Sequence, residues 1–184
     1  MHKIAASGFT LAEMLMTIVI LGILAKAAIP LLSANDPQKL SVAAEETANT
    51  LRFALSEAKR TGGYVLVDGS TAQRLKLYNS NSNAQIPPTL GTSAINDPVT
   101  KRATNLNVNA SAFSQGVTLT PQFRAGGSAW LQLLIGPGLT QLQGFDGAST
   151  NKGALQANSG VLLSYGAQSV TVNINEITGL VTLP

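Results

Sequence analysis

The sequence predicts an α+β protein in which a long N-terminal α-helix packs on an antiparallel β-sheet domain. Three observations predict this class. An apolar run extends from Phe9 to Leu32, an apolar repeat of three and four residues follows from Leu40 to Ala58, and the pattern alternates every two residues beyond Gly63. At 184 residues, of which 11% are charged, the chain is long enough for an apolar stem and one globular domain with its own core.

The first expected element is a helix over the stem, residues 9–32. It has enough residues to cross a hydrocarbon core, for which about 20 are needed. Glu13 precedes an uncharged stretch that ends at Ala25. Because an ionised side chain at membrane depth costs about 2.5–3.5 kcal/mol, Glu13 needs a partner there. Lys26 lies near the far end, where a long side chain can reach the interface, and we interpret it as an interfacial anchor.

Gly22 and Pro30 disturb the regularity of this helix. Pro30 removes a backbone donor and clashes with the carbonyl group of Lys26, so the helix should bend or loosen over residues 26–29. Gly22 weakens the turn before it. A static kink and a helix that partly unwinds both fit this pattern.

A second, amphipathic helix is expected within residues 33–63. Asp36 as N-cap and Pro37 at the first helical position give a strong start signal, and Gly62-Gly63 gives a stop signal. The predicted apolar face, which would bury against a sheet, consists of Leu40, Ala44, Ala48, Leu51, Leu55 and Ala58.

The remaining residues, 64–184, predict a β-rich globular domain. The alternating pattern predicts strands at 64–67 and 73–78, joined by a turn at Asp68-Gly69, and further strands at 116–120, 129–135 and 161–165. Residues 169–174 and 180–183 should form a closing hairpin through Asn175 to Gly179. Asn79 to Pro88 is expected to be a loop, with weak structure continuing to about Asn105.

The residues at the head of the stem carry a recognisable motif. A short basic segment with Lys3 ends at Gly8, and Phe9-Thr-Leu-Ala-Glu13 opens the apolar helix. This arrangement resembles the N-terminus of type IV prepilins and of type II secretion pseudopilins. One helix followed by a strand-rich domain is also the pilin plan. The helix, first hairpin, variable middle and terminal hairpin look most like the H-type minor pseudopilins and their pilus counterparts.

The resemblance implies roles for particular residues. Residues 1–8 would be a prepilin leader peptide, cut by prepilin peptidase between Gly8 and Phe9, and Phe9 would then be N-methylated. Glu13 would face the amine of Phe9 in a neighbouring subunit and set the register of assembly. A buried charge of this kind is tolerated when it is paired. Gly22 and Pro30 match helix-disrupting sites at which the stem partly unwinds on assembly.

The composition argues against an enzyme. The only histidine is His2, inside the leader, and the chain has no cysteine, which excludes the usual zinc ligand sets and the Ser-His and Cys-His nucleophiles. The carboxylates of Asp68, Asp97, Asp146 and Glu176 are far apart in sequence and lie in predicted turns. Residues 146–151 are the one faint candidate for a calcium loop. We therefore predict no catalytic residue, no cofactor and no metal.

The expected function is that of a structural filament subunit, most simply a minor pseudopilin of a type II secretion system. A minor type IV pilus pilin, used in adhesion, twitching or DNA uptake, is the alternative, with residues 79–105 as a binding surface. Expected partners are other pilin or pseudopilin subunits, prepilin peptidase, the inner-membrane assembly platform and, before assembly, the bacterial inner membrane. The chain would cross that membrane once, with a cytoplasmic N-terminus and a periplasmic domain, and then enter a periplasmic or extracellular filament.

Nucleic acid is not an expected partner. The net charge of +3 falls by one when Lys3 leaves with the leader, and the basic residues are scattered. Lys101-Arg102, together with Arg74 and Lys76, are the best candidates for DNA contacts, and we interpret them as solvated surface. Trp130 is expected in the core.

Overall fold

The computed structural model describes residues 11–32, 36–80, 93–136, 141–146 and 150–184. The chain divides into two compact units, Met1–Asp36 and Pro37–Pro184, and each is described by itself. Gly8, Phe9 and the rest of the predicted leader lie outside the described residues, as do positions 81–88 of the predicted loop.

The first unit contains the helix α1 (Leu11–Leu32), which confirms a helical stem. Glu13 lies in its first turn, where a negative side chain interacts favourably with the helix dipole. The helix continues through Gly22 and Pro30. The bend or loosening expected over residues 26–29 stays a prediction, since a helix can bend at a proline and still continue.

The second unit opens with α2 (Asp36–Thr61), whose start and end match the predicted signals. Gly62 adopts a left-handed backbone with φ 65°, as expected for the residue that ends a helix. Thr61 Oγ1 donates to the Glu57 carbonyl oxygen (2.7 Å) and accepts from the Gly63 N–H (3.2 Å). These bonds connect the last turn of α2 to the residue that follows Gly62.

The described strands form two antiparallel sheets. The first has six strands in the order β3-β2-β1-β6-β7-β8 and the second has five in the order β11-β10-β9-β4-β5. The first sheet consists of β1 (Tyr64–Asp68), β2 (Arg74–Ser80), β3 (Asn105–Asn107), β6 (Gln132–Ile135), β7 (Gln143–Phe145) and β8 (Asn151–Ala154). The second consists of β4 (Thr118–Ala125), β5 (Ser128–Trp130), β9 (Ser159–Tyr165), β10 (Gln168–Ile174) and β11 (Val181–Thr182).

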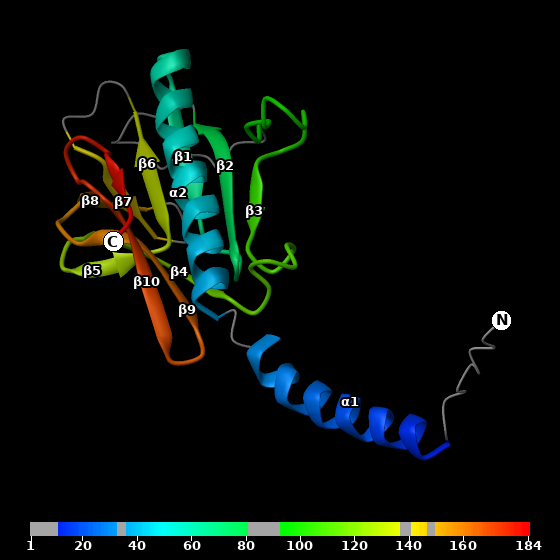
Figure 1. Ribbon diagram of the computed structural model, residues 1–184. Coiled ribbons are helices and arrows are strands. Elements are labelled where there is room, and N and C mark those ends of the chain that lie inside the picture. The colour runs from blue at the N-terminus through cyan, green and yellow to red at the C-terminus, as the bar shows by residue number, and fades with distance from the viewer. Residues whose placement is uncertain (1–10, 33–35, 81–92, 137–140, 147–149) are drawn as a thin grey trace. The chain divides into compact units, whose positions relative to one another are not determined.

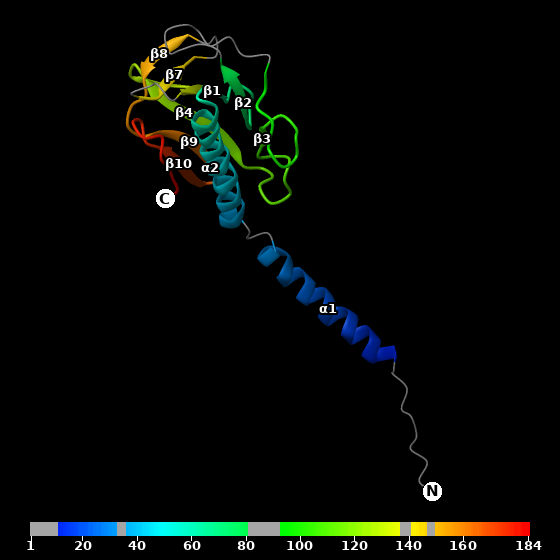
Figure 2. The ribbon, with the colours of Figure 1, turned by 90° about the horizontal axis from the view of Figure 1, so that it is seen from above.

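The core lies entirely within the second unit and joins α2 to both sheets. In Figure 1, α2 runs across β1, β2 and β6, and the turned view in Figure 2 again shows strands beside the helix. The predicted apolar face of α2 is buried, except that Leu55 is only half-buried. It shares one core cluster with side chains of the first sheet, such as Val65 and Leu75, and of the second, such as Leu163 and Val172. The second unit therefore carries what it needs to fold without α1.

The strand predicted over residues 129–135 is wrong as a single element. Residues 128–130 form β5 and pair with β4, whereas 132–135 form β6 and pair with β1 in the other sheet. The chain crosses between the sheets at Leu131, whose carbonyl oxygen accepts a hydrogen bond from the Gly69 N–H (2.9 Å). The apolar run contains no turn residue, so its pattern could not show that its two halves have different partners.

Other boundaries also need correction. Asn79 and Ser80 belong to β2 rather than to a loop, and the strand predicted at 116–120 is displaced to Thr118–Ala125. Pro121 is accommodated inside β4 because β5 pairs only with Phe123–Ala125. The short strands β3, β7 and β8 were not expected. They are short and rich in Asn, Gln and Gly, residue types that are depleted in strands or do not favour them, so local pattern gives little sign of them.

Candidate functional site

The described part of α1 exposes large apolar side chains on all sides. Their exposed fractions run from 51% at Ile20 to 82% at Leu11. The set comprises Leu11, Met14, Leu15, Met16, Ile18, Val19, Ile20, Leu21, Ile23 and Leu24. With 3.6 residues per turn, these positions cover the whole circumference of the helix. A contiguous apolar surface of this kind marks a site of interaction, and α1 is therefore the candidate functional site.

Glu13 is the only charged residue between Leu11 and Ala25. The other polar side chain nearby, Thr17, donates its Oγ1 hydrogen to the Met14 carbonyl oxygen at 2.8 Å. This bond lets the threonine lie on an apolar helix without an outside partner. An ionised carboxylate cannot donate such a bond. When this surface is covered, the carboxylate of Glu13 loses its contact with water, and a cation beside it would offset that cost.

The two predicted helix-disrupting positions, Gly22 and Pro30, both lie within α1. A Cβ placed on Gly22 would meet no atom within 4 Å, so packing inside this chain does not explain a glycine at this position. Lys26 is exposed. Among the residues that the structure describes, no helix combines the length and the apolar character needed to cross a membrane.

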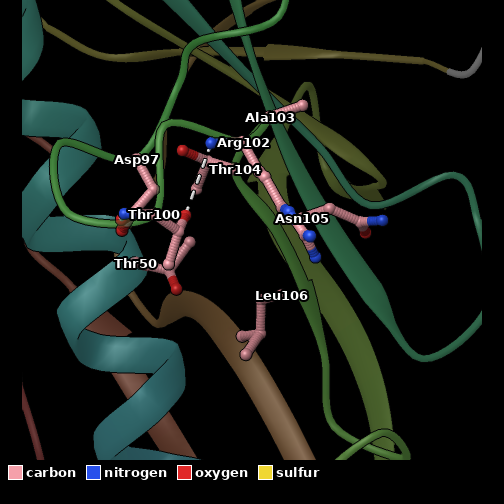
Figure 3. Close-up of a pocket in the computed structure, with 8 residues that line it drawn as sticks. All are labelled: Thr50, Asp97, Thr100, Arg102, Ala103, Thr104, Asn105 and Leu106. Atoms are coloured by element: carbon pink, nitrogen blue, oxygen red, sulfur yellow. Dashed lines mark hydrogen bonds between the residues drawn. The ribbon is translucent and has the colours of Figure 1, made fainter.

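The basic pair Lys101-Arg102 lies in a hairpin beside the edge of β2. The Ile95 N–H donates to the Leu77 carbonyl oxygen (2.9 Å), and the Asp97 N–H donates to that of Arg102 (2.8 Å). Both basic side chains are exposed. A pocket lies between this hairpin and Thr50 of α2, and Figure 3 shows the hairpin residues that line it. This hairpin corrects the expectation of weak structure up to residue 105.

Asp97 holds the tip of that hairpin. Its Oδ1 atom accepts hydrogen bonds from the backbone N–H groups of Thr100 (2.7 Å) and Val99 (2.9 Å). The bond from Thr100 is the main reason that the pKa of Asp97 lies below its ordinary value, and the positive charge of Lys101 adds to the effect. The carboxylate therefore stabilises a turn, as predicted for Asp97, and its position does not suggest a catalytic role.

Arg74 and Lys76 share one face of β2, on the opposite side from the buried Leu75 and Leu77. Both basic side chains are half-buried. They lie on a regular strand, while Lys101 and Arg102 lie on the hairpin, so the four basic residues do not belong to one element.

The segment around Asp146, which was the predicted candidate for a calcium loop, already has the ammonium group of Lys152 beside its carboxylate. Lys152 Nζ lies 2.9 Å from Asp146 Oδ2, and the Thr150 N–H donates to Asp146 Oδ1 at 2.8 Å. The ammonium group of Lys152 also lies 4.9 Å from the centre of the Trp130 ring. A lysine in this place neutralises the carboxylate that a calcium ion would need. Within the described residues, no three His, Cys, Asp or Glu side chains gather in a way that could hold a metal.

The prediction that Trp130 lies in the core is wrong. It is half-buried, its Nε1 donates to the Ala125 carbonyl oxygen (2.8 Å), and its ring faces Lys152. The indole ring thus closes the turn between β4 and β5. No pattern in the sequence around Trp130 indicated this arrangement.

Comparison with known proteins gives one result, and it concerns the head of the chain. Residues 5–28 match the family described as the prokaryotic N-terminal methylation motif. The matched segment includes Gly8, Phe9, Glu13 and Gly22. No curated protein and no solved structure matches the chain significantly.

The fold and the motif together define a class: an α+β protein with a pilin-like order of elements and an exposed apolar helix at its N-terminal end. The match supports the predicted relationship to type IV pilins and pseudopilins, and it supports a subunit that prepilin peptidase processes. The motif implies a membrane-anchored N-terminus and assembly with other pilin subunits. It does not separate the H-type subclass from the others.

Proposed function

We propose that this chain is a structural subunit of a type IV filament, specifically a minor pseudopilin of a type II secretion system. The supporting observation is α1, an apolar helix exposed on all sides with a single acid in its first turn. Exposure of such a surface to water is unfavourable, so another apolar surface or medium needs to cover it. A bilayer can cover it before assembly, and the helices of neighbouring subunits can cover it afterwards.

The carboxylate of Glu13 would fix the register of this packing, that is, how far neighbouring helices are shifted along one another. Inside a bundle of apolar helices an unpaired carboxylate is unfavourable by several kcal/mol, so only an arrangement that brings a cation to it is stable. After cleavage at Gly8, the new amine of Phe9 on an adjacent subunit would be that cation. The stem would cross the inner membrane once, with the domain in the periplasm, until an inner-membrane platform draws the subunit into the filament.

No enzymatic step belongs to this proposal. The peptidase cleaves and methylates the chain, which is its substrate. The chain itself contributes an apolar helix, a charge and a folded domain. Turnover of any substrate by the purified domain would contradict this part of the proposal.

Mass spectrometry of the protein from its native cell tests the proposal directly. We expect a chain that begins at Phe9, with the mass of one added methyl group on its amine. In a Gly8→Ala variant this species should be strongly reduced, while Ala6→Gly, in the same segment, should be processed normally. An intact Met1 in the natural protein, or a first residue beyond Leu32, would refute the proposal.

A minor type IV pilus pilin is the alternative, because it would use the same helix. Among the roles of such a pilin, DNA capture can be tested on the globular domain alone, because the Lys101-Arg102 pair is exposed there. We expect no specific DNA affinity, since the four basic residues Arg74, Lys76, Lys101 and Arg102 are divided between strand β2 and the hairpin beside it. Binding that weakens steeply with salt and disappears in a Lys101→Ala, Arg102→Ala variant would favour the pilus role.

A further inference from the structure

The loop between β3 and β4 carries an exposed aromatic ring on an ordered framework. Phe113 is 75% exposed. The buried Ser114 donates its Oγ hydrogen to the Val108 carbonyl oxygen (2.8 Å), and the Gly116 N–H donates to Asn109 Oδ1 (2.9 Å). Because these bonds close the loop on itself, the exposed position of Phe113 is part of a fixed structure.

This loop, residues 108–117, is bonded at its base to Gln73, the residue directly before β2. The Val108 N–H donates to the Gln73 carbonyl oxygen (3.2 Å), and the Leu119 N–H donates to Gln73 Oε1 (2.7 Å). Arg74, the first residue of β2, is half-buried and pairs with the last residue of β3. A cation therefore lies beside the base of the loop.

A second cation lies on the other side of the loop, in the first turn of α2. Gly116 has a φ of +89°, and a Cβ there would lie 2.8 Å from Cε2 of Tyr165. Lys39 Nζ donates to Tyr165 Oη (3.0 Å) and lies 4.6 Å from the centre of that ring. Figures 1 and 2 both show the loop near the beginning of α2. Since a positive charge in the first turn opposes the helix dipole, the stability of α2 does not explain this lysine.

The two cations have no carboxylate to neutralise them in the part of the chain that the structure describes. None of the ion pairs there involves Lys39 or Arg74. The loop contains no charged residue. The nearby Asp68, at the end of β1, is buried and accepts hydrogen bonds from the Ser70 N–H and the Gln132 amide. An exposed ring between two such cations fits a partner that is apolar below a negatively charged surface, as an anionic bilayer is.

The order of the chain brings such a bilayer within reach. Only three residues separate Leu32, the last residue of α1, from Asp36, the first residue of α2. A segment of this length spans at most about 14 Å. If the stem is anchored in the inner membrane, as proposed above, the first turn of α2 and the loop beside it lie close to the membrane surface.

We propose that before assembly the second unit contacts the bilayer surface through Phe113, Lys39 and Arg74. The ring of Phe113 enters the interfacial layer, and the two cations approach anionic lipid headgroups. The stem keeps the domain at the surface, so even a weak contact is populated. This inference rests on the proposed function, which places the stem in the membrane.

Quenching of tryptophan fluorescence by brominated lipids tests the contact on the full-length chain, reconstituted in vesicles of phosphatidylcholine and anionic phosphatidylglycerol. Phe113→Trp should be quenched. The wild type should not, because its single tryptophan, Trp130, pairs with Phe123 near the opposite end of β4 from the loop. Val99→Trp is the matched control: Val99 is 86% exposed, on the hairpin that bonds to the other half of β2, and this variant should behave like the wild type.

The role of charge is tested in the Phe113→Trp background. Lys39→Ala should lower the ratio of docked to undocked domain about fivefold, because one attraction to the anionic surface is lost. Lys59→Ala, which removes an exposed lysine from the last turn of α2, is the control and should leave the ratio unchanged. Circular dichroism and the Tm show whether each variant is folded.

Flotation of the same vesicles separates this inference from the proposed function. A chain that does not float with them would contradict both. A chain that floats, but whose Phe113→Trp variant is quenched no more than the wild type, would overturn the lipid contact alone. Reduced filament assembly of Phe113→Asp without that quenching would assign Phe113 to a neighbouring subunit instead, and equal quenching of Val99→Trp would overturn the assigned surface.

Discussion

The two helices that the structure describes are similar in length but suited to different surroundings. α1 carries apolar side chains around its whole circumference and has one acid near its start. α2 has a buried face of leucine and alanine and an exposed face with residues such as Glu45, Arg52 and Lys59. The comparison shows that α2 buries its apolar face in the domain in which it lies, whereas the described part of α1 leaves its apolar surface exposed.

Among the substitutions that test this contrast between α1 and α2, the largest effect is expected at Glu13. Glu13→Ala should leave the domain folded and the chain in the membrane fraction, yet abolish most incorporation into filaments, because the register charge is gone. Incorporation can be measured by cross-linking and by the amount of sheared filament. Glu45→Ala, a change of an exposed acid on α2, is the control and should assemble normally. Normal assembly of Glu13→Ala would remove the role assigned to the carboxylate.

The second prediction compares one leucine from each helix. Leu51 of α2 is fully buried, so Leu51→Ala should lower the free energy of unfolding of the domain by about 2–5 kcal/mol. Leu21 of α1 is 64% exposed, and Leu21→Ala should leave that free energy unchanged. Denaturant titration of both full-length variants in detergent measures the difference. Equal destabilisation would show that α1 is part of the folded domain, contrary to the contrast drawn here.

The third prediction concerns Gly22. Because a Cβ at this position meets open space, Gly22→Ala should be tolerated by the single chain and should favour the helix by about 1 kcal/mol. If the stem must unwind on assembly, the same variant should assemble more slowly than the wild type. Helicity by circular dichroism and the rate of filament growth are the two measurements. Unchanged growth with increased helicity would argue for a static helix.

The smallest effect is expected for an ion pair at the end of α2. Arg60 donates to both carboxylate oxygens of Glu57, and these bonds hold the pKa of Glu57 below its ordinary value. A lowered pKa contributes stability above the pKa of the unfolded chain, and this contribution is lost as the pH falls through the folded value. Glu57→Gln should therefore lower the Tm by about 1 °C or less at pH 7, and this difference should shrink as the pH falls below the ordinary pKa of a glutamate. An equal loss at pH 7 and below that pKa would point to packing instead.

Much of the helical structure could be predicted from local signals. Asp36-Pro37 and Gly62-Gly63 mark the ends of α2, and the repeat from Leu40 to Ala58 marks its buried face. The closing hairpin was also correctly placed, since Asn175 and Gly179 are strong turn residues. The division of residues 128–135 between two sheets, the hairpin that holds Asp97 and the pairing of Asp146 with Lys152 were not predictable, because each depends on residues distant in sequence or on backbone geometry.

The sequence by itself determined that the chain has an apolar N-terminal helix with one acid, preceded by a cleavage motif, and an amphipathic helix followed by strands. Those features follow from the spacing of neighbouring residues, which fixes which face of a helix or strand is apolar. Only the tertiary structure decided which strands pair, and that the turn at Ile177–Leu180 rests against α2. The turn and α2 are more than a hundred positions apart in the sequence, and β1 and β6 are more than sixty apart, so no local pattern records which partner has the complementary shape.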